Sequence, residues 1–549
     1  MSDNYSLPLE VLYRWERETP DQVFLRQPYP GQGYVDLTFR QAMQEIRRIA
    51  TAIRTKNFPP GSNIAILSKN CAHWMMTDYA IWMSGHCSVP LYPNLSEQTV
   101  RELLTHSESR LAFIGKLDQP EMYRKAVPAE IPCIAFPYHQ VKEAERWDDL
   151  VKTTAPMTSN PTRAMGELAT IIYTSGTTGE PKGVMHPFSS FAISGTEVLK
   201  IIPLSNQDRF FSYLPLAHVA ERILVQTVSL YCGASVAFAE SLDTFQENLR
   251  TIRPTVFLSV PRLWQKFQAG VLAKLPQRKL NILLKIPLLG NRIKKKIQTA
   301  LGLAEARFVV TGAAPTPPSL IEWFETIGIR LQEGIGMSEN FAYSHINRPG
   351  AIKIGTVGQP WPLVEAKIAE NGELLIKSPC NFRGYYRGTS KRSDFFDGEF
   401  FHTGDRGSID SDGYLKITGR TKEIFKTSKG KYVAPVPIET KLLSNPYLEA
   451  GCVVGENLSQ PMALAILSVS AAQMAKETLK AELAAHLAHV NEALDPHERL
   501  QHLIITREPW TIENGILTPT LKVKRAEIES RYNPHLETWQ KNTEPVIFE

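Results

Sequence analysis

Apolar residues in the first 350 positions form short runs separated by stretches long enough for a helix. The runs are 63–68, 109–114, 168–173, 209–214, 235–239, 255–259 and 307–311, and residues 39–56 carry apolar positions at helical spacing. Strands that alternate with helices usually form parallel sheets covered by helices. The pattern therefore predicts an α/β fold with mostly parallel sheets, in which ligands bind at the strand ends.

Past residue 360 the pattern changes to shorter strands divided by turns, at 364–368, 373–376 and 414–417. A helix is expected at about 471–494. A chain of 549 residues is too long for one hydrophobic core. We expect a large N-terminal domain with a β-rich subdomain over 1–419, a hinge at 420–422, and a small α+β C-terminal domain over 423–549.

The most informative segment is 173–183, which follows a predicted buried strand and contains four short hydroxyl side chains, three glycines and Lys182. Backbone N–H groups, hydroxyls and a lysine at a strand end can bind a polyphosphate. The spacing differs from the common nucleotide loop, because Gly176 and Gly179 are too close and Pro181 precedes the lysine. Taken alone, the segment is more typical of a surface turn rich in Ser, Thr and Gly.

Four further blocks follow in order, at 332–339, 401–405, 419–423 and 517–525. With the phosphate segment, they resemble the adenylate-forming superfamily of acyl-CoA synthetases, peptide-synthetase adenylation domains and luciferases. Segments 213–222, 259–264 and 431–435 are similar to the long-chain fatty acyl-CoA synthetase branch. The resemblance covers nearly the whole chain. It implies a ligase that uses ATP and Mg²⁺ to activate a carboxylate as an acyl adenylate and transfers the acyl group to coenzyme A.

The resemblance also assigns roles to the phosphate segment. The residues implied to hold the β- and γ-phosphates are Thr174, Ser175, Gly176, Thr177, Thr178, Gly179 and Lys182. Glu339 and the Thr174 hydroxyl are implied Mg²⁺ ligands, oxygen donors of the kind that this ion prefers. The alternative for Glu339 is an acid that caps a helix after Ser338.

The adenosine is implied to lie between two other segments. These are Gly312, Ala313 and Ala314, and Glu333, Gly334, Ile335, Gly336, Met337 and Ser338. Asp405 is implied to accept hydrogen bonds from the ribose hydroxyls, assisted by Arg420. Ile335 departs from the family pattern, which has an aromatic residue there. Loss of a stacking preference of roughly 0.5–1.5 kcal/mol predicts weaker ATP binding.

Lys522 is the expected catalytic lysine of adenylate formation, although the neighbouring Lys524 and Arg525 leave the assignment open. In relatives the small C-terminal domain is mobile and rotates about the residue that matches Lys422. Rotation would bring Lys429, Gly430 and Lys431 to the coenzyme A entrance. His218 borders the carboxylate pocket of relatives and is a candidate catalytic residue or a packed loop histidine.

Composition narrows the possible partners and cellular locations. A net charge of +5 does not call for nucleic acid, and six scattered cysteines are typical of reduced core thiols in a cytoplasmic protein. No signal peptide or membrane-spanning segment is expected. Segment 272–303 is basic and apolar, so we expect either peripheral contact with an anionic membrane or an amphipathic helix packed on the core.

Three functions fit these observations. The first is a long-chain fatty acid–CoA ligase. The second is an adenylate former that loads a carrier protein or uses an aryl or other carboxylate. The third is an inactive lipid-binding or scaffold protein that kept the fold.

Overall fold

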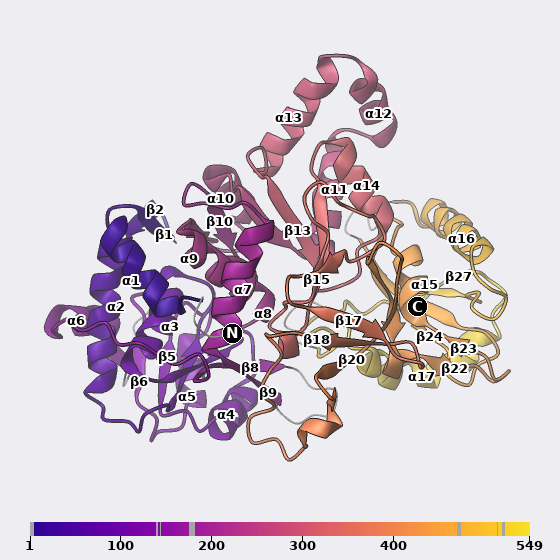
Figure 1. Cartoon of the computed structure of the whole chain (residues 1–549). Coiled ribbons are helices and arrows are strands. Elements are labelled where there is room, and N and C mark those ends of the chain that lie inside the picture. The colour runs from indigo at the N-terminus through magenta and orange to yellow at the C-terminus, as the bar shows by residue number, and fades with distance from the viewer. Residues whose placement is uncertain are drawn as a thin grey trace.

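The computed structural model describes residues 5–138, 141–142, 144–174, 182–468, 471, 474–512, 514–518 and 522–549. Two large, mostly parallel sheets with covering helices form the N-terminal part, and an antiparallel sheet leads to a smaller C-terminal unit (Figure 1). The predicted α/β class is confirmed.

The first sheet has the strand order β7-β6-β5-β3-β4-β8-β9, and only the β8–β9 pair is antiparallel. Its strands are β3 (Asn63–Leu67), β4 (Cys87–Leu91), β5 (Leu111–Ile114), β6 (Cys133–Ala135), β7 (Glu145–Arg146), β8 (Leu168–Thr174) and β9 (Lys182–Pro187). β3, β4 and β5 are buried along their whole lengths, and β3 and β5 match the apolar runs predicted at 63–68 and 109–114.

The second sheet has the order β16-β15-β14-β13-β12-β10-β11-β1-β2, and its five central pairings, from β14 to β1, are parallel. Its strands are β1 (Val23–Tyr29), β2 (Gly33–Thr38), β10 (Arg209–Ser212), β11 (Ser235–Phe238), β12 (Val256–Ser259), β13 (Phe308–Gly312), β14 (Leu331–Ile335), β15 (His345–Ile346) and β16 (Gln359–Pro360). Each strand expected from the apolar runs is present within a few residues of its predicted range.

Helices cover both sheets, and their apolar faces form three clusters with the strands. They are α1 (Pro8–Glu18), α2 (Phe39–Arg54), α3 (Ala72–Ser84), α4 (Glu97–His106), α5 (Pro120–Ala126), α6 (Trp147–Thr153), α7 (Phe188–Ile201), α8 (Val219–Glu221), the π-helix Arg222–Thr227, α9 (Val228–Cys232), α10 (Phe245–Ile252), α11 (Pro261–Lys274), α12 (Gln277–Lys285), α13 (Leu289–Leu301) and α14 (Pro318–Thr326). The central helix α3 is buried on all sides, which is why its sequence lacks a polar face.

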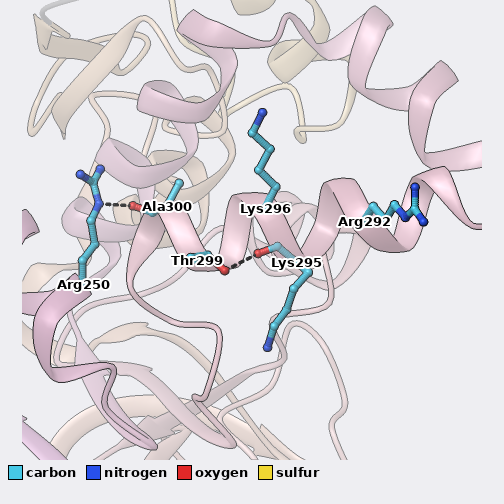
Figure 2. Close-up of a pocket in the computed structure, with 6 residues that line it drawn as sticks. All are labelled: Arg250, Arg292, Lys295, Lys296, Thr299 and Ala300. Carbon is cyan, nitrogen blue, oxygen red and sulfur yellow. Dashed lines mark hydrogen bonds between the residues drawn. The ribbon is translucent and has the colours of Figure 1, made fainter.

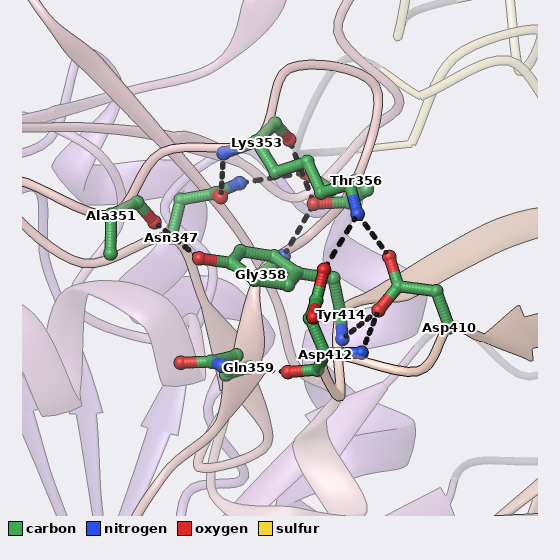
Figure 3. Close-up of polar contacts among 9 residues, drawn as sticks. All are labelled: Asn347, Ala351, Lys353, Thr356, Gly358, Gln359, Asp410, Asp412 and Tyr414. Carbon is green, nitrogen blue, oxygen red and sulfur yellow. Dashed lines mark hydrogen bonds and ion pairs between the residues drawn. The ribbon is translucent and has the colours of Figure 1, made fainter.

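The β-rich subdomain is antiparallel, as its turn-divided sequence predicts. Its strands are β17 (Glu365–Ile368), β18 (Glu373–Lys377), β19 (Phe396–Asp397), β20 (Phe400–Ile409) and β21 (Leu415–Arg420). A polar cluster joins it to the nine-stranded sheet (Figure 3). Lys353 Nζ lies 2.6 Å from Asp410 Oδ2, and Gln359 Nε2 donates to the Asp412 carbonyl at 2.9 Å.

The C-terminal unit has its own sheet of order β24-β25-β26-β27 and two apolar clusters drawn from residues 425–547. Its elements are β22 (Phe425–Lys426), β23 (Tyr432–Val433), α15 (Pro435–Leu442), β24 (Leu448–Val454), β25 (Met462–Leu467), α16 (Lys476–Glu492), β26 (Leu503–Ile505), α17 (Arg525–Gln540) and β27 (Val546–Phe548). The helix expected at 471–494 is the shorter α16.

Candidate active site

Several candidate residues lie where parallel strands end. Thr174 ends β8, Gly312 ends β13, and the loop that contains His218 follows β10. The carboxyl ends of parallel strands are where α/β proteins bind ligands. Both large sheets therefore contribute to one candidate site.

Glu339 lies in the first turn of a short 3₁₀ helix, Ser338–Asn340. One of its carboxylate oxygens, Oε1, accepts a hydrogen bond from the Tyr385 hydroxyl at 2.8 Å. The Phe382 N–H donates to the Glu339 carbonyl at 2.7 Å. His186 Nε2 donates to the Ser338 carbonyl at 2.6 Å and fixes the other side of the turn. Two other segments thus hold the Glu339 turn, 382–385 and β9, and the Tyr385 hydroxyl fixes the carboxylate.

Lys182 and Glu339 share Tyr385 as a neighbour. Lys182 Nζ lies 5.7 Å from the centre of the Tyr385 ring, within the range of cation–π attraction. Lys182 also pairs with Thr174 across the antiparallel β8–β9 ladder. Segment 175–181, which contains the other predicted phosphate-binding residues Ser175, Gly176, Thr177, Thr178 and Gly179, lies outside the described residues.

Asp405 and Arg420 face each other on β20 and β21. Arg420 Nε donates to Asp405 Oδ1 at 3.0 Å, and the Asp405 side chain is 9% exposed. Burial raises the pKa of Asp405, although the charges of Arg420 and Lys522 oppose that rise. Asp405 Oδ2 forms no hydrogen bond with a described residue.

Lys522 lies beside this pair. Burial lowers the pKa of its ammonium group, Arg420 lowers it further, and Asp405 opposes both effects. The side chain nevertheless keeps contact with solvent. Two hydrogen bonds join Thr518 and Lys522: the Thr518 N–H donates to the Lys522 carbonyl at 2.8 Å, and the Lys522 N–H donates to Thr518 Oγ1 at 3.0 Å.

The structure separates Lys522 from the rest of its basic run. Arg525 begins α17 and its Nη2 donates to the buried carboxylate of Glu439 at 2.6 Å, inside the C-terminal unit. The Lys524 N–H donates to the Ile516 carbonyl at 2.8 Å. Of these three residues, Lys522 is the one whose charge affects Asp405 and His218.

His218 caps the short helix α8, and its Nδ1 accepts a hydrogen bond from the Ala220 N–H at 3.2 Å. Burial, together with the neighbouring charge of Lys522, lowers the pKa of the His218 imidazole to about 3. The ring is therefore neutral near pH 7. With Nδ1 accepting, its proton is on Nε2, where it can donate to a carboxylate.

The segments predicted to hold adenosine lie side by side. Gly312 pairs with Gly334 in the parallel β13–β14 ladder, and a Cβ on Gly312 would lie 2.8 Å from the Gly334 carbonyl oxygen. Ala313 has a φ of 66° and turns the chain away from the strand. Ile335 packs against the main apolar cluster.

The Glu333 carboxylate accepts a hydrogen bond from the Thr316 N–H at 2.9 Å, and burial raises its pKa to about 7. The half-buried residues Gly336 and Met337 continue from β14 to the Glu339 turn. A Cβ on Gly336 would lie 2.4 Å from the Ala342 backbone, so only glycine fits there. Ala314 is exposed in the loop after β13.

The predicted hinge and coenzyme A residues lie on the surface of the C-terminal unit. Lys422 is exposed in the 3₁₀ turn Thr421–Glu423. Lys429, Gly430 and Lys431 form the exposed turn between β22 and β23, where Gly430 has a φ of 77°. No hydrogen bond or ion pair of the described chain joins the side chains of Lys429 and Lys431 to the residues around Lys522.

The site residues are compatible with Mg²⁺ held largely by a substrate. Among the described residues, no group of three or more His, Cys, Asp or Glu side chains is arranged to bind a metal ion. Mg²⁺ commonly uses one or two protein oxygen ligands together with substrate phosphates. The anchored carboxylate of Glu339 and the hydroxyl of Thr174 are donors of that kind.

Two functional neighbours were missed by sequence reasoning. Tyr385 contacts both Glu339 and Lys182, but nothing in its local sequence suggests this role. Asn70 follows β3 and binds the loop that contains His218: its Nδ2 donates to Ser212 Oγ at 2.8 Å and to the Leu214 carbonyl at 2.5 Å, and its Oδ1 accepts from the Leu216 N–H at 2.9 Å. The sequence signal that could have identified Asn70 is its place in the polar segment 68–70 that follows a buried strand.

The chain has sequence relatives over most of its length. Residues 12–386 match the AMP-binding enzyme family, and residues 422–544 match the AMP-binding enzyme C-terminal domain. The chain is 30% identical to the long-chain-fatty-acid–CoA ligase FadD15 of Mycobacterium bovis, with 96% of each chain covered. It is 27% identical to long chain acyl-CoA synthetase 2 of Arabidopsis thaliana, over 91% of this chain and 86% of the relative.

Solved structures share the fold. The anthranilate CoA ligase AuaEII in complex with anthranoyl-AMP superposes with a TM-score of 0.82 at 21% identity, covering 97% of this chain and 99% of that one. The adenylation domain of the carboxylate reductase from Mycobacterium chelonae gives a TM-score of 0.84 at 22% identity, covering 98% and 92%. The chain belongs to the AMP-binding enzyme family.

Proposed function

We propose that the protein is a magnesium- and ATP-dependent long-chain fatty acid–CoA ligase. The position of Lys522 beside Asp405, Arg420 and His218 is the observation that carries the proposal. This position of Lys522 supports a domain orientation suited to adenylate formation, the first of two half-reactions. The names of the sequence relatives support the choice of long-chain acids and coenzyme A.

In the first half-reaction, a carboxylate oxygen of the fatty acid bonds to the α-phosphorus of ATP, and the bond to pyrophosphate breaks. Negative charge builds on the phosphoryl oxygens, and the Lys522 ammonium group would stabilise it. Lys182 would bind the departing phosphates. Mg²⁺, held by Glu339 and Thr174 together with phosphate oxygens, would neutralise part of their charge.

The remaining residues would orient the substrates. The Asp405 oxygen that Arg420 leaves free can accept a ribose hydroxyl, and the neutral His218 can donate to the fatty acid carboxylate. Gly312 and the Glu333–Ser338 segment would bind the adenine. Positioning of this kind accounts for a large part of the catalysis available without a protein nucleophile.

In the second half-reaction, the coenzyme A thiol attacks the acyl carbonyl carbon, the bond to AMP breaks, and the thiol proton leaves to solvent. We assign residues 1–419 to the large domain, 420–422 to the hinge and 423–549 to the rotating domain. Rotation about Lys422 would withdraw Lys522 and bring Lys429, Gly430 and Lys431 to the thiol entrance. Such domain motions commonly gate catalysis.

Contacts between the two domains favour the first orientation. Arg262 of α11 forms an ion pair with Glu449 of β24, and Gln265 Nε2 donates to the Leu443 carbonyl at 3.3 Å. The Arg262 and Glu449 side chains are 21% and 17% exposed. A partly buried pair is less screened by water than a surface pair.

Glu449→Gln is expected to slow adenylate formation about three- to fivefold, because the orientation that presents Lys522 loses about 1 kcal/mol. Thioester formation from supplied acyl adenylate should be unchanged or faster. The two steps are measured by pyrophosphate exchange and by single-turnover acyl-CoA formation. Lys416→Gln, at an exposed site without an ion pair to a described residue, is the control. Equal slowing of both steps would contradict this role of the contact.

The substrate assignment is tested with straight-chain acids of increasing length, aryl acids and short acids, each with Mg·ATP and coenzyme A. AMP release and acyl-CoA formation should both depend on the acid. Each methylene that enters an apolar tunnel should raise kcat/KM up to about fourfold, from about 0.8 kcal/mol of burial. Acceptance of aryl or short acids alone would overturn the long-chain assignment. Acyl adenylate formation without transfer to coenzyme A would indicate a carrier-loading enzyme.

A further inference from the structure

Helices α12 and α13 form a hairpin that projects from the body of the large domain (Figure 1). Its inner face is anchored: Leu280, Ile297 and Leu301 belong to a buried apolar cluster. Trp323 Nε1 of α14 donates to Gln277 Oε1 at 2.8 Å, and Gln298 Nε2 donates to the Ile327 carbonyl at 2.8 Å. The inner face of the hairpin therefore packs on the protein's own core. The rest of the hairpin lies in solvent.

The far end of the hairpin exposes apolar side chains. We call this the tip; it consists of Ile282, Ile286, Leu288 and Leu289, which are 65%, 42%, 81% and 38% exposed. These are four of the eight large apolar side chains exposed in the described chain, and they fall within eight consecutive residues. Clustered exposed apolar residues usually indicate a surface that binds a partner or a membrane.

The backbone at the tip is also unusual. Leu288 has a φ of 65°, a region that leucine rarely adopts. The same residue has an 81% exposed side chain. Glycine would relieve the strain, and a polar residue would be better solvated. Strained backbone that presents a residue to solvent is typical of functional sites.

Charge distinguishes the kind of partner. Segment 272–303 contains eight lysines and arginines and no acidic residue, so it contributes +8 to the chain's net +5 and the rest of the chain contributes −3. Of these eight, only Lys295 has an ion-pair partner in the described chain, Glu305 at 3.9 Å. The basic charge is therefore available to an external anion.

Some of these basic side chains line a shallow groove of about 660 Å³ at the base of the hairpin (Figure 2). Arg250, Arg292, Lys295 and Lys296 line it with Thr299 and Ala300. Arg250 Nε donates to the Ala300 carbonyl at 2.7 Å and joins α10 to the end of α13. The groove thus presents several cations on a fixed scaffold behind an apolar tip.

We propose that the hairpin docks the protein on an anionic lipid bilayer, with the tip inserted among the acyl chains and the basic side chains against lipid phosphates. An apolar end bordered by lysines and arginines is complementary to such an interface, where each basic residue contributes about 1 kcal/mol, or about fivefold in binding. No helix of the described chain is long and apolar enough to cross a bilayer. The contact is therefore peripheral.

Co-sedimentation of the full chain with vesicles tests this proposal. Vesicles of phosphatidylcholine with about one-third phosphatidylglycerol should bind the protein, pure phosphatidylcholine much less, and added salt should release it. Ile282→Ser with Leu288→Ser should lower binding at least about tenfold. Arg292→Gln with Lys295→Gln and Lys296→Gln should lower it about 100-fold.

Matched controls are Leu242→Ser, at an apolar residue 89% exposed outside the hairpin, and Lys416→Gln, at an exposed lysine. Both controls should bind vesicles like the unaltered protein. All variants should keep the unaltered melting temperature and the unaltered activity on a water-soluble acid, because they change no candidate site residue. Vesicle binding, the main readout, does not depend on which acid the enzyme uses.

Three outcomes would overturn the proposal. One is vesicle binding that the hairpin variants leave unchanged. Another is a dimer, detected by light scattering, that the tip variant dissociates while vesicles bind neither form. The third is binding of duplex DNA with the same dependence on the basic residues and no binding to anionic vesicles.

Discussion

Lys522→Met is expected to lower the rate of acid-dependent pyrophosphate exchange into ATP by about 10²–10³. The substitution removes a positive charge that lies beside Asp405, Arg420 and His218, where the reacting phosphoryl group is proposed to bind. Thioester formation from supplied acyl adenylate should change by less than about threefold, since we propose that domain rotation withdraws Lys522 in that step. The split between the two steps distinguishes a catalytic role from misfolding, which would lower both.

Lys524→Met is the matched control for this experiment. It removes the same charge two residues away, and Lys524 is absent from the charges that affect Asp405 and His218. Its exchange rate should stay within about twofold of the unaltered enzyme. A larger loss from Lys524→Met than from Lys522→Met would refute the assignment.

Arg222→Met is expected to lower the free energy of unfolding of the large domain by about 3–5 kcal/mol. The Arg222 and Asp78 side chains are both fully buried, with Arg222 Nη1 3.1 Å from Asp78 Oδ2. Removing the cation leaves the Asp78 carboxylate buried, and among the described residues it keeps the hydrogen bond from Gln226 Nε2 at 2.7 Å. Methionine fills much of the volume of the arginine side chain. The loss of unfolding free energy therefore measures the effect of the missing charge more than that of a cavity.

The surroundings of Arg222 explain how one cation is accommodated in the core. Its guanidinium carbon lies 5.3, 5.8 and 5.2 Å from the ring centres of Trp74, Trp82 and Phe191. These aromatic faces replace part of the lost hydration. Arg222 also begins the π-helix Arg222–Thr227, a rare element that often occurs at functional sites.

A double variant separates the charge from the packing. Arg222→Met combined with Asp78→Asn removes both charges and keeps an acceptor for Gln226, so it should be more stable than Arg222→Met alone. Arg17→Met, which breaks the exposed ion pair with Glu18, should shift stability by no more than about 0.5 kcal/mol. Calorimetric unfolding transitions provide the measurement. A double variant as unstable as Arg222→Met would show that packing dominates.

Much of the fold follows from local pattern. The apolar runs that became β3, β8, β10, β12 and β13 were visible because strands buried on both faces need continuous apolar sequence. Boundaries were less accurate: the helix expected at 471–494 covers Lys476–Glu492. Residues 519–521 beside Lys522 and 175–181 beside Lys182 lie outside the described residues.

Two residues named from separate motifs lie together in the structure, whereas contacts made by segments outside the motifs were not predicted. Asp405 and Arg420 were both named and pair across β20 and β21. Tyr385 was missed because its hydroxyl meets Glu339 from a segment 46 residues away. Glu449 was missed for the same reason, because its partner Arg262 lies 187 residues earlier.

The sequence by itself determined the α/β pattern, the order of the chemical motifs, and the excess of basic charge in 272–303. Those properties depend on residue type and spacing along the chain, which can be read without knowing which segments are in contact. Only the tertiary structure decided that Lys522 faces Asp405 while Arg525 pairs with Glu439, and that the tip of the α12–α13 hairpin is left in solvent. Each of these depends on which distant surfaces pack together, and burial of a charge or an apolar side chain is a property of that packing.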